Sequence, residues 1–401
     1  MSLMSEVGQK AFNLGVPLAV HMDITYRCNE RCVHCYLDHD DHGEMTTAEI
    51  KDTLDQLAEA GVFFLTFSGG EVFMRRDFFE LVEHARRLMF NVKIKTNAVM
   101  IHEEEARKIR DLAVDTIQIS VYSHRPEVHD AITKLPHSFE RTVQSIRFLR
   151  EQGLRVTIAN VLMTANSADH AGVQKLAADL DANYTLDPTI TPMMDGDTSV
   201  LALRIPGEEL TEVFHNPALV GNQEEFCAPP QPPSAEDLEG YSCSAGHSFC
   251  YISPYGDVFP CVQFPLPTGN VRQQKFLDIW NFSPQMNEVR SIQAKDLTVC
   301  SSCTHVSSCT RCPGLAYMEG SMRGPSTADC EKSFYRTGIP TANMVRQGLA
   351  KPRSTSGKSA PLIQIQPIQI PSNQIPSNQI PPIETQPIPV LADGGMPIAL
   401  S

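Results

Sequence analysis

The sequence lacks the features that define several classes of protein. No apolar run in its 401 residues reaches the ~18–20 residues that a membrane-spanning helix requires. Residues 1–10 show no basic start, apolar middle and small-residue cleavage site, so we expect no secretory signal and a cytoplasmic location. Basic residues are scarce, with 33 Lys and Arg against 47 Asp and Glu, and the resulting net charge of −14 disfavours nucleic acid as a partner.

Cysteine is absent from a long central stretch, although the chain contains 12 cysteines. Three lie between Cys28 and Cys35, and the other nine lie between Cys227 and Cys330. Structural disulfides are rare in a reducing cytosol, so metal ligation or catalysis is the favoured interpretation. The cysteine-free stretch therefore predicts a scaffold that joins two metal-bearing regions.

The scaffold shows short apolar runs that alternate with helical patterns. We expect six strands, at residues 18–24, 62–67, 92–96, 116–122, 156–163 and 184–191. Thr46 and Glu49 have the spacing of a capping box at the start of one helix. Strands separated by ~10–15-residue helices predict right-handed crossovers and a parallel sheet. The fold class is therefore α/β, a partial (β/α)6 barrel of the TIM type with active loops at the carboxyl ends of its strands.

The composition divides the chain into five expected regions. They are an N-terminal extension (1–17), the partial barrel (18–222), a Pro-rich linker (223–240), a cysteine-rich domain (241–338) and a disordered Pro/Ile/Gln-rich tail (339–401). The cysteine-rich domain shows little helical periodicity, which indicates a small apolar core. We therefore expect bound metal to stabilise this domain more than apolar packing does. The tail repeats Gln-Ile-Pro-Ser-Asn at 369–373 and 374–378, and proline at this density excludes helices and interior strands.

The first group of cysteines has the spacing Cys28-x3-Cys32-x2-Cys35 directly after the first predicted strand. Three cysteines can ligate three irons of a 4Fe–4S cluster and leave the fourth iron open to chelate a substrate or cofactor. The alternative is a zinc site completed by His34 or His39, because imidazole is an ordinary zinc ligand.

This motif resembles the signature of the radical S-adenosylmethionine (radical SAM) enzymes. The resemblance implies that the cofactor's methionine binds the open iron and that reductive cleavage releases a 5′-deoxyadenosyl radical. Ser68-Gly69-Gly70-Glu71 matches the family loop that binds the methionine amino group. The residues that the resemblance assigns to cofactor binding are His34, Tyr36, Gly69, Gly70, Glu71, Asn97, Ser120 and Asn160. For Asn97, Ser120 and Asn160, ordinary capping at strand ends is an equal alternative.

The late cysteines are similar to the SPASM extension of radical SAM enzymes, which carries two auxiliary 4Fe–4S clusters. The resemblance implies an inner cluster on Cys243, Cys250, Cys261 and Cys312, and an outer one on Cys300, Cys303, Cys309 and Cys330. Two residues separate Cys309 from Cys312 where the family has three, and Cys227 is left over. A pair of zinc ribbons is the alternative for this region.

The SPASM resemblance implies an oxidoreductase that modifies a ribosomal peptide or protein. The alternatives are a tetrapyrrole side-chain decarboxylase, a sulfatase-type protein maturase, and a zinc-dependent interaction module with no enzymatic activity. A tetrapyrrole carries several carboxylates, and the motifs place few basic residues at the strand ends, which favours a peptide. Arg204 is a further candidate residue, which could bind a carboxylate of the cofactor or of the substrate.

The expected partners follow from the same resemblance. They are a peptide or protein substrate and a reductant such as flavodoxin or ferredoxin, without nucleic acid or membrane. The barrel begins by about residue 18, which leaves no room for the N-terminal peptide-recognition domain of many maturases. We therefore expect either a separate recognition protein or direct binding of the peptide by the barrel.

Overall fold

The fold is built on a nine-stranded sheet, seen in a computed structural model that describes residues 3–350. The predicted tail beyond residue 350, with its five-residue repeat, lies outside the described residues. The strands are β1 (Ala19–Thr25), β2 (Phe64–Gly69), β3 (Asn91–Thr96), β4 (Thr116–Ser120), β5 (Val156–Val161), β6 (Asn183–Asp187), β7 (Phe249–Ile252), β8 (Asp257–Phe259) and β9 (Gly269–Asn270). Their order in the sheet is β6-β5-β4-β3-β2-β1-β7-β8-β9.

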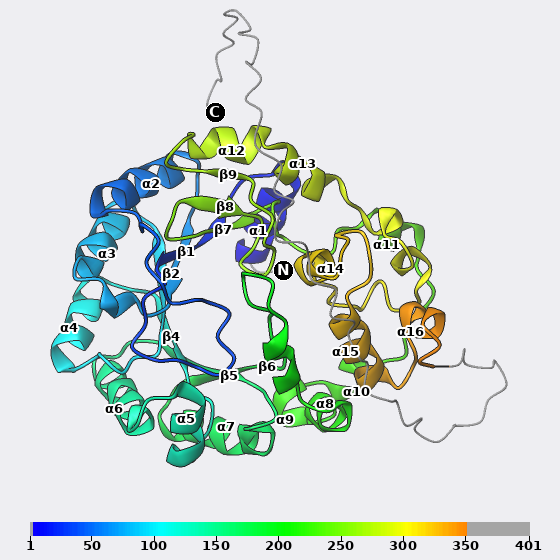
Figure 1. Cartoon of the computed structure of the whole chain (residues 1–401), viewed down its shortest axis with the longest axis horizontal. Coiled ribbons are helices and arrows are strands. Elements are labelled where there is room, and N and C mark those ends of the chain that lie inside the picture. The colour runs from blue at the N-terminus through cyan, green and yellow to red at the C-terminus, as the bar shows by residue number, and fades with distance from the viewer. Residues whose placement is uncertain (1–2, 351–401) are drawn as a thin grey trace, which may run out of the picture. The chain divides into compact units, whose positions relative to one another are not determined.

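Strands β1 to β6 confirm the predicted partial barrel. Each pairs with the next in parallel, as right-handed crossovers through helices require. Figure 1 shows the helices lining the outer side of the strands. The helices of the barrel are α2 (Thr47–Glu59), α3 (Phe78–Arg87), α4 (Glu103–Asp111), α5 (Pro126–Thr133), α6 (Ser138–Glu151) and α7 (His170–Asp179). They follow β1 to β5 in chain order, so each strand end leads into a loop on the same side of the sheet.

The remaining helices flank the barrel or belong to the cysteine-rich region. They are α1 (Leu3–Leu14), α8 (Gly207–Phe214), α9 (Pro217–Val220), α10 (Gln223–Phe226), α11 (Ala235–Glu239), α12 (Phe276–Phe282), α13 (Pro284–Ser291), α14 (Pro313–Met318), α15 (Thr327–Thr337) and α16 (Ala342–Arg346). Among residues 3–350, no helix combines the length and the apolar character needed to cross a lipid bilayer.

The sequence patterns account for the barrel elements. Thr46 and Glu49 form the predicted capping box at the start of α2, and Ile50, Leu54 and Leu57 of that helix are fully buried. Alternation on the strands sorts side chains between two environments. On β3, Val92 and Ile94 are fully buried in the apolar core on the helix side of the sheet, so the residues between them face the barrel interior.

The cysteine-rich region is less separate than its composition predicts. Strand β7 pairs in parallel with β1, with Val20 opposite Cys250, and β8 and β9 extend the sheet in antiparallel fashion. An unpaired β1 would expose a row of backbone N–H and C=O groups, and β7 satisfies them. All described residues fall within one compact unit rather than in two domains.

The predicted boundaries of the linker and tail also need correction. Short helices α10 and α11 lie within the predicted linker, and Ser234 caps α11. The tail does not begin at residue 339, because α16 follows, capped by Thr341. Met344 of α16 is buried against Cys330 and Phe334, an apolar anchor that the proline-based prediction did not weigh.

Candidate active site

The candidate active site is a cavity of about 710 Å3, lined by the barrel strands and the loops that follow them. Cys28, Cys32 and Cys35 line it and are partly buried. Their loop is fixed at the C-terminal end of α5: the backbone N–H groups of Arg31 and Val33 donate to carbonyl oxygens of that helix at 3.0 Å each. The predicted cofactor-binding residues that also line the cavity are His34, Tyr36, Gly69, Gly70, Asn97, Ser120 and Asn160.

Gly69 and Gly70 let the loop after β2 pack directly against the start of the cysteine loop. The Gly70 N–H donates to the Thr25 carbonyl oxygen at 2.8 Å. A Cβ atom at Gly69, where φ is +138°, would lie 2.1 Å from that oxygen, and one at Gly70 would lie 2.4 Å from the Arg27 oxygen. Glycine is therefore required here for the contact between two backbone segments, in addition to any approach of a ligand.

Glu71 has a different place from the one the resemblance implies. It is fully buried and does not line the cavity. Its carboxylate accepts hydrogen bonds from the Thr96 hydroxyl at 2.8 Å and from the Asn97 N–H at 2.8 Å, and burial raises its pKa. Because Thr96 and Asn97 do line the cavity, Glu71 supports the cavity wall through these two hydrogen bonds.

Three polar side chains around the cavity are suited to hold a ligand. The Asn97 Nδ2 donates to Asn29 Oδ1 in the cysteine loop at 2.7 Å, which links β3 to that loop. Asn160 donates to the Val121 carbonyl oxygen at 2.7 Å, but its buried Oδ1 has no partner in the described part of the chain. His34 Nδ1 is likewise buried and unpartnered, and burial lowers the His34 pKa to about 4, so the imidazole is neutral. Unpaired buried polar atoms are costly, so these two fit a site that a ligand completes.

The spacing of the cysteines suits an iron–sulfur cluster better than a zinc ion. A tetrahedral zinc ion with thiolates at about 2.3 Å draws its ligands close together. Among residues 3–350, the one set of three or more potential ligand atoms within 4.8 Å of one another consists of Asp38, Asp40 and His42, which are exposed. A 4Fe–4S cluster binds each cysteine at a different corner, which accommodates the wider spacing.

The interior of the barrel contains basic side chains that the sequence analysis did not single out. Lys93 and Lys95 of β3 and His21 of β1 all line the cavity. The signal was present in the alternation of Asn91–Thr96, because the buried Val92 and Ile94 leave the two lysines on the opposite face. The prediction considered only basic residues at the strand ends, and it did not take these two lysines within β3 into account.

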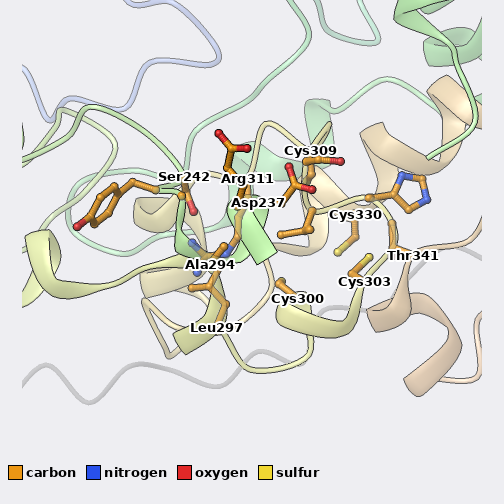
Figure 2. A pocket seen from close by; sticks show the side chains of 16 residues that line it. Asp237, Ser242, Ala294, Leu297, Cys300, Cys303, Cys309, Arg311, Cys330 and Thr341 are labelled. Atoms are coloured by element: carbon orange, nitrogen blue, oxygen red, sulfur yellow. The ribbon is translucent and has the colours of Figure 1, made fainter. Parts of the chain in front are cut away.

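The four cysteines expected for the outer cluster line a second cavity, of about 440 Å3. Figure 2 shows them around this space, with the sulfur atoms of Cys303 and Cys330 turned toward one another. The neighbouring backbone contacts one of these thiols: the Ala342 N–H donates to Cys303 Sγ at 3.4 Å. Burial raises the pKa of Cys300 to about 11 and that of Cys330 to about 12, so a metal must replace these protons.

The four cysteines expected for the inner cluster interact electrostatically, since Cys261 acts on the pKa of Cys243 and of Cys250, but one of them has a different environment. The pKa of Cys243 is raised to about 11, first by burial and then by the charges of Cys261 and Cys312. Cys250 differs: it is a fully buried member of the apolar core. Alternation on β7 explains this placement, because the next residue, Tyr251, points into the barrel and donates to Asp23 Oδ2 at 2.9 Å.

The inner cysteines adjoin the active-site cavity through the segment after Cys261. Val262 and Gln263 line the cavity, and Gln263 Nε2 donates to Thr191 Oγ1 at 2.7 Å. The Cys312 thiol lies 3.8 Å from Gln263 Oε1. A cluster on these cysteines would therefore stand next to the substrate space.

Two other candidates lie outside these sites. Cys227 lines neither of the two cavities, and its thiol donates to the Phe214 carbonyl oxygen at 3.3 Å. Arg204 does not line the barrel cavity and instead lies near Glu319 and Glu331, whose pKa values burial raises and Arg204 lowers.

Two family models match the chain. The model described as the radical SAM superfamily matches residues 22–172, and the model described as an iron–sulfur cluster-binding domain, SPASM, matches residues 243–313. The first contains all three early cysteines, and the second contains the late ones except Cys227 and Cys330.

Curated relatives include enzymes of two kinds. The mycofactocin maturase MftC of Mycobacterium tuberculosis is 30% identical over 310 residues, which span 74% of this chain and 78% of the relative. An AdoMet-dependent heme synthase of Methanosarcina barkeri is 28% identical over 326 residues, which span 75% of this chain and 92% of the relative.

Solved structures share the fold at low identity. Streptococcus suis SuiB bound to S-adenosylmethionine superposes with a TM-score of 0.65 at 18% identity, over 81% of this chain and 80% of that one. The enzyme anSMEcpe with bound AdoMet superposes with a TM-score of 0.60 at 16% identity, over 80% and 96% of the two chains. At these identities the likeness establishes the barrel and its cysteine-rich extension as a shared fold.

Proposed function

This chain belongs to the radical SAM superfamily and carries a SPASM iron–sulfur domain, and we propose that it makes an oxidative modification in a ribosomal peptide or protein. The observation that carries the proposal is that one cavity is lined both by the cysteine loop after β1 and by the residues that follow Cys261. A radical generator and an electron acceptor would thus face the same substrate. Such an arrangement suits a net oxidation, for example a crosslink.

The residues of the barrel fit a cluster and its cofactor. Cys28, Cys32 and Cys35 would ligate three irons. Asn97, Ser120 and Asn160 would contact the cofactor, and the unpartnered Asn160 Oδ1 offers an acceptor for a donor on it. When bound, S-adenosylmethionine and its 4Fe–4S cluster supply a 5′-deoxyadenosyl radical that removes hydrogen from an unactivated carbon, and auxiliary clusters supply an electron acceptor. The cavity walls would hold the target carbon in reach and exclude water.

The late cysteines would hold the auxiliary clusters. Cys300, Cys303, Cys309 and Cys330 line one cavity and form a complete set of four. Cys243, Cys261 and Cys312 supply three ligands beside the active site. A small reductant such as flavodoxin or ferredoxin would deliver the electron that starts the reaction, and a separate recognition protein remains part of the proposal for a leader-bearing peptide.

The relation to MftC supports a peptide substrate, since the name of that relative is that of a maturase. The test is anaerobic co-expression of the enzyme with each small open reading frame beside its gene, followed by the intact mass of each peptide. A loss of two hydrogens indicates a crosslink, and a loss of carbon dioxide indicates decarboxylation. A Cys32→Ala enzyme is the matched control, because it retains the chain and lacks one cluster ligand. No change in any peptide, also in heavy water, would contradict the proposal.

A second candidate function is the decarboxylation of a tetrapyrrole side chain. The relation to the heme synthase and the cationic groups Lys93 and Lys95 in the cavity both favour it. Anaerobic incubation with propionate-bearing porphyrins tests this candidate, with loss of carbon dioxide as the expected result. Product from a porphyrin and none from any peptide would replace the first proposal by the second.

A further inference from the structure

The inner end of the barrel cavity holds two lysines without partners. Lys93 and Lys95 lie two residues apart on β3 and line the cavity on the same face of the sheet. Within residues 3–350, neither ammonium group takes part in an ion pair or a hydrogen bond. A partly buried ammonium is unfavourable unless an anionic group compensates its charge.

The carboxylates around the cavity act on the charge of Lys95 and not on that of Lys93. Asp23 and Asp187 are the carboxylates whose charges act on Lys95. The Asp23 carboxylate is also engaged by the Tyr251 hydroxyl at 2.9 Å and by His21 Nε2 at 3.1 Å. For Lys93, the one charged neighbour that affects the pKa is Lys95, which lowers it after burial does. Within residues 3–350, no carboxylate is therefore among the groups that act on Lys93.

These lysines lie far enough from the cysteine loop to bind the end of a substrate that is distant from the reacting carbon. Lys93 precedes Asn97 by four residues, a distance of about 13 Å along the strand. Asn97 is the residue that contacts the cysteine loop, through Asn29 at 2.7 Å. The space between is lined by Lys95 and by uncharged polar groups, including Gln118 and Thr157, which lie opposite each other on β4 and β5. A substrate fixed at Lys93 would have to extend over most of this distance, on the order of ten bonds, to bring an atom within reach of the cysteine loop.

From this arrangement we infer that Lys93 and Lys95 bind a carboxylate of the substrate at the inner end of the barrel cavity. The inference rests on the proposed function in one respect, namely that the substrate occupies this cavity. A carboxylate accepts charge-assisted hydrogen bonds from both ammonium groups and balances the charge of Lys93. The C-terminus or an acidic side chain of a peptide and the propionate of a tetrapyrrole share this chemistry, so the test has an arm for each.

The test is a binding measurement that does not depend on turnover. The reconstituted holoenzyme with S-adenosylmethionine is titrated under anaerobic conditions with two kinds of matched pairs. One pair is coproporphyrin III, a porphyrin with four propionates, and its tetramethyl ester. The other set is each peptide encoded beside the gene, as the free acid, as the C-terminal amide, and with Asp and Glu replaced by Asn and Gln. We expect at least one acid to bind at least 10-fold more tightly than its neutral form.

Two variants locate the carboxylate. Lys93→Met keeps the length of the side chain and removes its charge, and we expect it to reduce the preference for the acid to about 1-fold. Lys175→Met is the control, because Lys175 pairs with Asp179 on the exposed surface of α7, and its acid preference should equal that of the wild type. Equal binding of acid and neutral forms by the wild type, binding of none of the acids, or an unchanged preference in Lys93→Met would overturn the inference.

The outcomes separate this inference from the proposed function. Acid-selective binding of the porphyrin with no modified peptide would leave the carboxylate site standing and remove the peptide-maturase proposal. A modified peptide that binds equally well as acid and as fully neutral form would do the reverse. If Lys93→Met fails to fold, the comparison of acid and neutral forms with the wild-type enzyme still tests whether the cavity binds a carboxylate.

Discussion

The barrel and the cysteine-rich region hold their cysteines in different ways. In the barrel, a large apolar core lies between the strands and the outer helices, and the cysteine loop is fixed by hydrogen bonds to α5 and to Asn97. In the cysteine-rich region, the core near the outer cysteines is small, with Cys330, Phe334 and Met344 as its buried members. The barrel thus positions its thiols with protein contacts, whereas the outer cysteines have a small core around them and, on the proposed function, would depend on a bound metal.

The largest expected effect is on chemistry, with the barrel fold unchanged. On the proposed function, Cys32→Ala removes one of the three thiolates that would hold the cluster in the barrel, so cleavage of S-adenosylmethionine to 5′-deoxyadenosine under dithionite should fall by about 1,000-fold or more. The loop contacts through Arg31 and Val33 use backbone atoms and should keep the thermal unfolding midpoint close to that of the wild type. Cys227→Ala is the control, since Cys227 lies outside both cavities. Cleavage at the wild-type rate would show that this loop is not the radical-generating site.

For the outer cysteines we expect the opposite, namely a loss of local stability in the cysteine-rich region. Cys303→Ala should raise amide hydrogen exchange in residues 297–346 by about 100-fold, or about 2.8 kcal/mol of local stability, because little apolar core remains there without the cluster. Exchange in β1 to β5 should stay as slow as in the wild type. Hydrogen exchange read out by mass spectrometry checks both regions in one experiment. Equal protection of residues 297–346 in variant and wild type would show that protein contacts alone hold this region.

A smaller effect is expected where the two backbone segments of the barrel site touch. Gly70→Ala would place a Cβ atom 2.4 Å from the Arg27 oxygen and 2.5 Å from the Tyr26 oxygen. The backbone must move, so we expect a loss of about 1–3 kcal/mol in the free energy of unfolding, measured by denaturant titration. Gly8→Ala in α1 is the matched control: nothing lies within 4 Å of its Cβ, and alanine in a helix should stabilise by up to about 1 kcal/mol. Equal stability of the Gly70 variant and the wild type would mean that the backbone of the loop after β2 can shift without a loss of stability.

The sequence allowed the barrel to be predicted in some detail. Alternating strands and helices predicted β1 to β6, and the spacing of Cys28, Cys32 and Cys35 predicted which loop lines the cavity. Parallel pairing of β7 with β1 could not be predicted, because it joins residues more than two hundred positions apart and β7 has only four residues. Contacts between residues distant in the sequence also limited the prediction for Glu71. Its motif indicated a ligand contact, but the hydrogen bonds that its carboxylate accepts from Thr96 and Asn97 could not be predicted from that motif.

The smallest expected effect separates Cys250 from the other inner cysteines. Its side chain lies in the apolar core on the face of β7 opposite Tyr251, so Cys250→Ala should retain all the iron of the wild type and cost only about 1 kcal/mol through a small cavity. Cys261→Ala should lose the inner cluster, because Cys261 lies near Cys243 and Cys312 and leads into the segment that lines the active site. Iron content and Mössbauer spectra of the two purified variants make the comparison. Equal iron loss in both would mean that β7 turns its thiol toward the cluster when metal binds, and that a buried apolar position in the barrel sheet serves the cysteine-rich region as a ligand.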